Sequence, residues 1–181
     1  MAIQTRKMTS TEFLAGPITN LPHELLNGEE IMSPTPVRIH QNTLGRLFIV
    51  VQALVPNGEV IFAPMDVYFD EENTVQPDLL WIAEGSACHW VENDKYLKGA
   101  PDLVVEILSP GSVRRDRKDK FRLYEKYGVR EYWMIDPEEK LLEIWQLQDG
   151  RLMLVDVFGS GDPCKSLLLG DVDMKAIFPQ N

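Results

Sequence analysis

A glutamate lies inside the run of the chain that most resembles a buried strand. Leu103 to Leu108 is apolar and has the length of a strand, with Pro101 before it and Ser109-Pro110-Gly111 after it. Glu106 interrupts this run. A carboxylate inside a buried strand costs free energy unless a metal ion, a cation or several hydrogen bonds receive it. Glu106 is therefore the first candidate for a functional side chain.

A lysine lies on the apolar face of the helix that should follow. The spacing predicts a helix from Asp116 to Tyr127, and Gly128 stands in the position favoured just past a helix end. At about 100° per residue, Lys120 falls among the residues of the apolar face. Its ammonium would then point toward the sheet that the helix covers, close to Glu106. The alternative is that Lys120 extends to the rim or pairs with Asp116 one turn earlier.

The second acid of a site has to come from one of two Pro-Asp pairs. Asp78 precedes the apolar run Leu79 to Ile82, and Asp102 precedes the strand that contains Glu106. Asp102 and Glu106 share one strand face, but four residues of extended chain separate them by roughly 13 Å, too far to hold one ion. Asp78 comes from another strand, which hairpin-like pairing can bring opposite Glu106. We therefore expect Asp78 to act with Glu106, and Asp102 to lie in a polar turn.

Length and composition indicate one globular domain over residues 1–181, with a loose leader at 1–8 and a packed tail at 159–181. The chain is 44% hydrophobic and 25% charged, which excludes a disordered protein. Cys88 and Cys164 lack metal or redox spacing and are expected as free thiols of a reducing compartment. No stretch resembles a secretory signal or a membrane span, so we expect a cytoplasmic protein.

Charge is distributed unevenly. The net charge of −10 argues against a basic surface all around the molecule. Between Arg114 and Lys126, however, seven basic and three acidic residues give a local charge of +4, whereas the rest of the chain carries −14. Such a run is either a solvated helix face or a patch that attracts phosphate groups.

The remaining pattern supplies the elements that must position these side chains. In chain order we expect a short helix capped at Thr9, a hairpin turning at Asn27-Gly28, a helix from His40 to Val55, one or two strands from Glu59 to Phe69, a strand from Gln76 to Ile82, a loop over 83–98 with a short helix around Trp90, a strand from Val129 to Ile135, and an outer hairpin from Leu141 to Phe158. This order predicts an α/β (α+β) fold of sandwich type. His40 could be a ligand or a phosphate contact, or only a capping or surface residue.

These residues resemble the Uma family, which lies within the PD-(D/E)xK nuclease superfamily. The resemblance covers about residues 9–158. It is densest at the following positions: Glu24-Leu-Leu-Asn-Gly-Glu29, His40, Gln76-Pro-Asp78, Ala100 to Pro110, Arg115-Asp116, Lys120, Tyr124 and Gly128 to Pro137. The superfamily places its lysine two residues after the acid, where this chain has Leu108. Lys120, from the following helix, would take the place of that lysine.

The resemblance implies a restriction-endonuclease-like mixed sheet flanked by helices, with added N-terminal and C-terminal β-hairpins. It also implies that Asp78, Glu106 and the main-chain carbonyl of Ile107 hold a divalent cation. Mg²⁺ is expected, with Mn²⁺ as an alternative, because every ligand is oxygen. Lys120 would orient or deprotonate the attacking water, or stabilise charge in the transition state. Glu29 is either an additional acid or a solvent-facing residue of the hairpin.

Three functions follow from these observations. The first is a metal-dependent endonuclease that hydrolyses phosphodiester bonds in DNA. The second is a catalytically silent module that binds nucleic acid or protein through the basic run. The third is a buried ion network of Asp78, Glu106 and Lys120 that is purely structural. Trp and Tyr residues expected to be exposed around the outer hairpin leave room for a homodimer surface.

Overall fold

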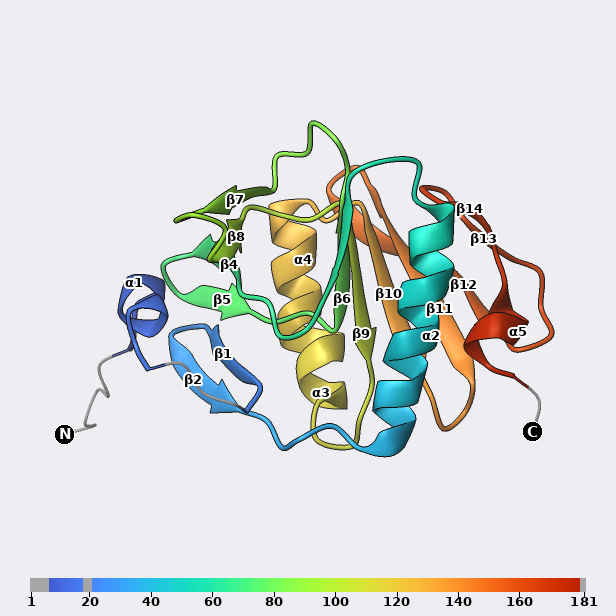
Figure 1. Ribbon diagram of the computed structural model, residues 1–181, viewed down its shortest axis with the longest axis horizontal. Helices are drawn as coiled ribbons and strands as arrows, with labels where there is room; N and C mark the ends of the chain where they lie inside the picture. Colours follow the sequence, from blue (N-terminus) through green and yellow to red (C-terminus); the bar gives the residue numbers. More distant parts are fainter. Residues whose placement is uncertain (1–6, 18–20, 180–181) are drawn as a thin grey trace.

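The computed structural model describes residues 7–17 and 21–179, which form two six-stranded sheets (Figure 1). The first sheet contains β1 (His23–Leu26), β2 (Glu29–Met32), β4 (Val67–Asp70), β5 (Asn73–Val75), β7 (His89–Val91) and β8 (Tyr96–Lys98), in the order β2-β1-β5-β4-β8-β7. The second contains β3 (Glu59–Phe62), β6 (Leu79–Ile82), β9 (Leu103–Ile107), β10 (Glu131–Asp136), β11 (Leu141–Gln148) and β12 (Arg151–Gly159), in the order β12-β11-β10-β9-β6-β3. The predicted mixed sheet flanked by helices is confirmed.

The second sheet is the central layer of the molecule. Helix α2 (Arg38–Leu54) covers one face, where Leu47 and Val51 pack against Val105 and Trp133. Helix α4 (Phe121–Tyr127) covers the other face and separates it from the first sheet (Figure 1). Strands β9 and β10 are parallel, as a strand–helix–strand connection through α4 requires. Because both faces of β9 are covered, Glu106 is buried, with only 3% of its surface exposed.

The helix before β10 is irregular at the position of the candidate lysine. It begins with α3 (Val113–Arg115), continues through one π-helical turn, η1 (Asp116–Lys120), and ends with α4. Gly128 closes it with a φ of 84°, the left-handed geometry that glycine accepts without strain. The helix therefore starts three residues before the expected Asp116. Isolated π-turns of this kind occur often at functional sites.

The N-terminal hairpin forms as predicted, and it is tied to the residues before it. Asn27 and Gly28 both have positive φ, as a two-residue hairpin turn demands. Of the leader predicted as loose, residues 1–6 lie outside the described residues, but residues 7 and 8 contact the rest of the protein. Lys7 forms an ion pair with Glu72 at 3.1 Å, and the amide of Met8 donates to the carbonyl of Gly28. Helix α1 (Ser10–Leu14) starts at the expected cap, Thr9.

Two sequence predictions were wrong, one for residues 83–98 and one for the surroundings of the outer hairpin. Residues 83–98 contain no helix around Trp90; they form the β7–β8 hairpin instead. The strands are only three residues long, too short to show a periodic pattern in the sequence. The aromatic residues expected on the surface near the outer hairpin are not exposed: Tyr132 and Trp133 are buried, and Trp145 is half-buried and meets Phe121 edge to face.

The exposed apolar side chains of the outer hairpin are aliphatic. They are Leu141 at the start of β11 and, on the edge strand β12, Met153, Leu154, Val155 and Val157.

The tail packs against the central sheet through a small hairpin, β13 (Cys164–Ser166) with β14 (Gly170–Val172), and helix α5 (Met174–Ile177). Glu131 at the start of β10 anchors it. The carboxylate of Glu131 is fully buried and accepts hydrogen bonds from Ser166, Leu167 and Leu168. This second buried acid therefore has a complete structural explanation.

Both cysteines are buried and free. Within the described part of the chain, no helix has the length and hydrophobicity needed to cross a membrane. The expected cytoplasmic location stays a prediction.

Candidate functional site

Strand pairing brings Asp78 and Glu106 to the same place. Strands β6 and β9 are antiparallel with Leu79 opposite Val105, so one step further along the register sets Asp78 opposite Glu106. The Oδ2 atom of Asp78 accepts a hydrogen bond of 2.7 Å from the backbone amide of Ile107. The hairpin-like arrangement expected from the sequence thus places Asp78, Glu106 and the backbone of Ile107 side by side.

Lys120 reaches this place from the π-helical turn, with only 2% of its surface exposed. Its Nζ lies 2.9 Å from Glu106 Oε1, 2.6 Å from Glu24 Oε1 and 3.9 Å from Asp116 Oδ1. The alternative in which Lys120 extends to the rim is wrong, and Asp116 is the most distant of its three carboxylates. Burial lowers the pKa of Lys120, but the carboxylates of Glu106, Glu24 and Asp116 outweigh it and raise that pKa above its ordinary value.

Glu106 accepts hydrogen bonds from the described residues through one of its two carboxylate oxygens. Both Lys120 Nζ and the hydroxyl of Tyr124, at 2.6 Å, donate to Oε1. Among the described residues no hydrogen bond ends on Oε2. Burial raises the pKa of Glu106 well above its ordinary value, against the opposing effect of the Lys120 ammonium. A further cation at Oε2 would therefore stabilise the ionised form.

His40 contacts the other acid. Its Nε2 lies 3.2 Å from both carboxylate oxygens of Asp78. The capping and surface roles weighed from the sequence are both wrong, because α2 begins at Arg38 with Val37 as its cap and the ring of His40 is buried. Burial lowers the pKa of His40, but the hydrogen bond and the charge of Asp78 raise it above its ordinary value overall.

These side chains surround a cavity of about 300 Å³. Three buried side-chain atoms of the described residues have no hydrogen-bond partner in the protein: His40 Nδ1, Arg115 Nε and Asp116 Oδ1. All three residues line this cavity, together with Asp78 and Glu106. Buried polar atoms without partners are rare in folded proteins and indicate that water, an ion or a ligand completes the site.

The charges around the cavity do not balance within the protein. Four acids and two permanent cations line it: Glu24, Asp78, Glu106 and Asp116, with Arg115 and Lys120. Arg115 lies 3.6 Å from Glu24 and donates to Ser33 Oγ, so its charge is already engaged. A cavity with this excess of carboxylates attracts a cation.

The donor set fits Mg²⁺ better than a transition metal. No cluster of three or more His, Cys, Asp or Glu side chains with the geometry of a metal cage occurs in the described ranges. Mg²⁺ does not need such a cage, because it usually keeps several waters and takes one or two carboxylates plus substrate phosphate oxygens. Glu106 Oε2, the Asp78 carboxylate and the backbone of Ile107 border one cavity and can supply such a set.

Sequence reasoning missed two members of the site. Glu24 of β1 is buried against Lys120, and the other candidate of the same hairpin, Glu29, is exposed. Glu24 could have been found from alternation, since it shares a strand face with Leu26, which faces the core. Tyr124 lies one helical turn after Lys120 and could have been found by the same spacing that identified the lysine.

The basic run divides into three parts. Lys120 and Arg115 belong to the site, whereas Arg117 pairs with Glu143 and Lys126 with Asp70. Within the described chain, the exposed basic residues of the run that form no ion pair are Arg114, Lys118 and Arg122. They follow one another at four-residue intervals along α3, η1 and α4 and form the surface available to an anionic partner.

The chain is similar to one protein family and to solved structures. Residues 11–174 match the Uma2 family, whose description reads "Putative restriction endonuclease". A crystal structure from Anabaena variabilis ATCC 29413, described as "a putative nuclease belonging to DUF820", has a TM-score of 0.78 with this chain at 22% identity and covers 94% of this chain and 97% of that one. At this identity the likeness shows the fold. No curated protein matches the chain.

Proposed function

The chain belongs to the Uma2 family of restriction-endonuclease-like proteins, and from that membership we propose that it is a divalent-metal-dependent endonuclease of the PD-(D/E)xK type that hydrolyses phosphodiester bonds in DNA. One observation carries the proposal. Two acids from paired strands and one lysine from the following helix meet at a cavity whose lining residues include three buried polar atoms without a hydrogen-bond partner in the described protein. Chance convergence of three such side chains from distant parts of the chain is improbable.

In this proposal Asp78, Glu106 through Oε2, and the Ile107 carbonyl hold the cation, with Mg²⁺ preferred and Mn²⁺ accepted. When bound, the ion polarises the scissile phosphate and lowers the pKa of a water molecule. The backbone amide of Ile107 fixes the orientation of Asp78. Tyr124 holds Glu106 through the other oxygen, which leaves Oε2 for the cation.

Lys120 acts as a cation and not as a base. Its raised pKa keeps it protonated at neutral pH. Two of its three N–H donors are directed at Glu24 and Glu106, which leaves one donor for the phosphate or the attacking water. A positive charge held rigidly at this position stabilises the charge that develops on the phosphate oxygens in the transition state.

The exposed basic residues of the helix supply the attraction for DNA: Arg114, Lys118 and Arg122. They are exposed on the helix that also carries Lys120, but none of them lines the cavity, so they would draw DNA to this helix and leave the phosphate that is cut to the residues of the cavity. The acidic surface elsewhere would limit nonspecific contacts to this face.

The test is a cleavage assay on plasmid and linear DNA with Mg²⁺, Mn²⁺ or EDTA. The proposal expects cleavage with either ion, none with EDTA, and a rate at least about 100-fold lower in Glu106→Gln. A matched control is Glu143→Gln, an acid on β11 that pairs with Arg117 outside the cavity. DNA binding without cleavage under every ion would contradict the enzyme and favour a binding module.

A further inference from the structure

A second and larger cavity, of about 620 Å³, adjoins the first. The two share part of their lining, including His40, Gln76 and Asp78. Asp78 therefore forms part of the boundary between them. If the phosphate of a substrate lies at Glu106, the chemical group next to that phosphate can reach the second cavity. This larger cavity has no part in the chemistry proposed above.

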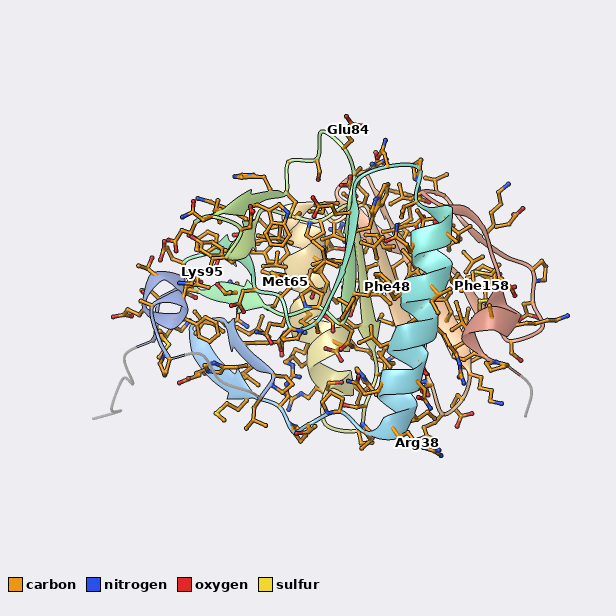
Figure 2. All side chains as sticks on the ribbon, viewed as in Figure 1. Arg38, Phe48, Met65, Glu84, Lys95 and Phe158 are labelled. Atoms are coloured by element: carbon orange, nitrogen blue, oxygen red, sulfur yellow. The ribbon has the colours of Figure 1, made fainter. Side chains whose placement is uncertain are left out.

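The lining of the larger cavity is apolar with a few polar groups. Phe13, Leu44 and Met65 contribute the apolar surface. The lining comes mostly from helices α1 and α2 and from the segments that precede β1, α2 and β4, and Figure 2 labels Met65 in the last of these segments. Apolar and aromatic surface with a small number of oriented polar groups is typical of sites for small organic molecules, and the volume lies within their usual range of about 300–1,000 Å³.

The polar groups favour an uncharged ligand that donates hydrogen bonds. Asp66 and Asp78 both line the cavity. Lys95 lines it too, but its ammonium lies 3.7 Å from Glu92 and donates to the carbonyl of Leu14, so a phosphate group there would meet the two carboxylates. Gln76 donates to Asp66 Oδ1 at 2.9 Å and holds the carboxylate in place, and no hydrogen bond from the described residues ends on Oδ2. A carboxylate oxygen in this situation is a ready acceptor for an amino or ring N–H group.

We propose that the larger cavity receives one unpaired nucleobase next to the phosphate that is cut. A nucleobase is flat and uncharged, has apolar faces and carries N–H donors on its edge, which matches this lining. The inference rests on the proposed function and adds the substrate class: nucleic acid with an unpaired nucleotide at the cleavage site. Removing a base from an intact duplex costs a few kcal/mol, and the cost is least where the base is already unpaired.

The test compares two tryptophan variants on helix α2. Gln41 is exposed and lines the larger cavity, so Gln41→Trp narrows the space without touching the core. Gln52→Trp is the matched control, because Gln52 is exposed on the same helix and lines neither cavity. Binding is measured with Ca²⁺ in place of Mg²⁺, on a duplex with a single-nucleotide bulge and on the same duplex without it. The bulged base is 2-aminopurine, whose fluorescence rises when it leaves a base stack.

Wild type and Gln52→Trp should bind the bulged duplex at least tenfold more tightly than the intact one, with a rise in 2-aminopurine fluorescence. Gln41→Trp should lose most of that preference and the fluorescence rise while keeping its affinity for intact duplex within about twofold. Equal affinity for both duplexes, or an unchanged preference in Gln41→Trp, would overturn the cavity assignment and leave the endonuclease standing. Failure of wild type to bind either duplex would overturn the endonuclease and the cavity assignment with it.

Discussion

Replacing Lys120 by methionine is the sharpest perturbation of the site, because it removes one charge and leaves an unbranched side chain only one atom shorter. Ion pairs at 2.6 and 2.9 Å are each worth about 6 kcal/mol at an effective dielectric constant of about 20, before any cost of leaving water. Desolvation of the lysine and the two glutamates offsets most of that gain. Breaking a buried ion pair from one side typically costs about 3–5 kcal/mol, since the partner charge stays buried.

We therefore expect Lys120→Met to lower the free energy of unfolding by about 3–5 kcal/mol, a large share of the roughly 5–15 kcal/mol typical of a domain. Urea denaturation measures this as a lower transition midpoint with an unchanged slope. The triple variant Glu24→Gln, Glu106→Gln and Lys120→Met should recover part of that loss, because it removes the two carboxylates nearest to the ammonium together with it, while Asp116 and Arg115 keep their charges.

A loss smaller than about 1 kcal/mol in the single variant would refute this reasoning. It would mean that the glutamates do not depend on the ammonium for their charge, and the picture of Lys120 as a rigidly held cation would fail. The triple variant separates stability from chemistry, because it should fold and still not cleave DNA.

Three further predictions concern charges in and around the site. Asp102 accepts hydrogen bonds from the Ala83 amide and from Arg130, and although burial raises its pKa, these contacts lower that pKa below the ordinary value. Asp102→Asn should therefore lower the free energy of unfolding by about 1.5–3 kcal/mol near pH 7 and leave cleavage unchanged. The difference from wild type should vanish as the pH falls below about 4. Burial raises the pKa of Asp116, so Asp116→Asn should stabilise the protein by about 1 kcal/mol at pH 7. Urea titrations should show this gain shrinking toward acid pH, so the change in stability has the opposite sign from that of Asp102→Asn. The last prediction concerns the exposed basic residues Arg114, Lys118 and Arg122. Neutralising all three should reduce the slope of log affinity against log salt concentration for DNA binding by up to about 2.7, and Lys175→Gln on α5 should not change that slope.

Local patterns in the sequence were sufficient to find the elements that carry the candidate acids and the lysine. Glu106 stands out because a buried strand rarely contains a carboxylate, and helical spacing turns Lys120 toward it. The place of Asp78 followed from pairing two apolar strands and excluding Asp102 by distance. Each of these inferences needs only the geometry of one or two adjacent elements.

The parts that could not be predicted depend on contacts between distant elements. Alternation along β1 turns Glu24 toward the core, but its contact with Lys120 also needs the pairing of β1 with β5 through Leu25 and Thr74, which no local pattern predicts. His40 reaches Asp78 because of where α2 crosses the sheet. The π-helical turn that carries Lys120 is irregular, and a constant rotation per residue does not anticipate it.

The central claim is that Asp78 and Glu106 hold one divalent cation between them. A crystal of the wild-type protein soaked in Mn²⁺ tests it directly through the anomalous difference map. The account predicts one strong peak within about 2.5 Å of carboxylate oxygens of both residues, absent from Glu106→Gln crystals treated in the same way. An empty cavity at saturating Mn²⁺, or a peak bound elsewhere, would contradict the claim.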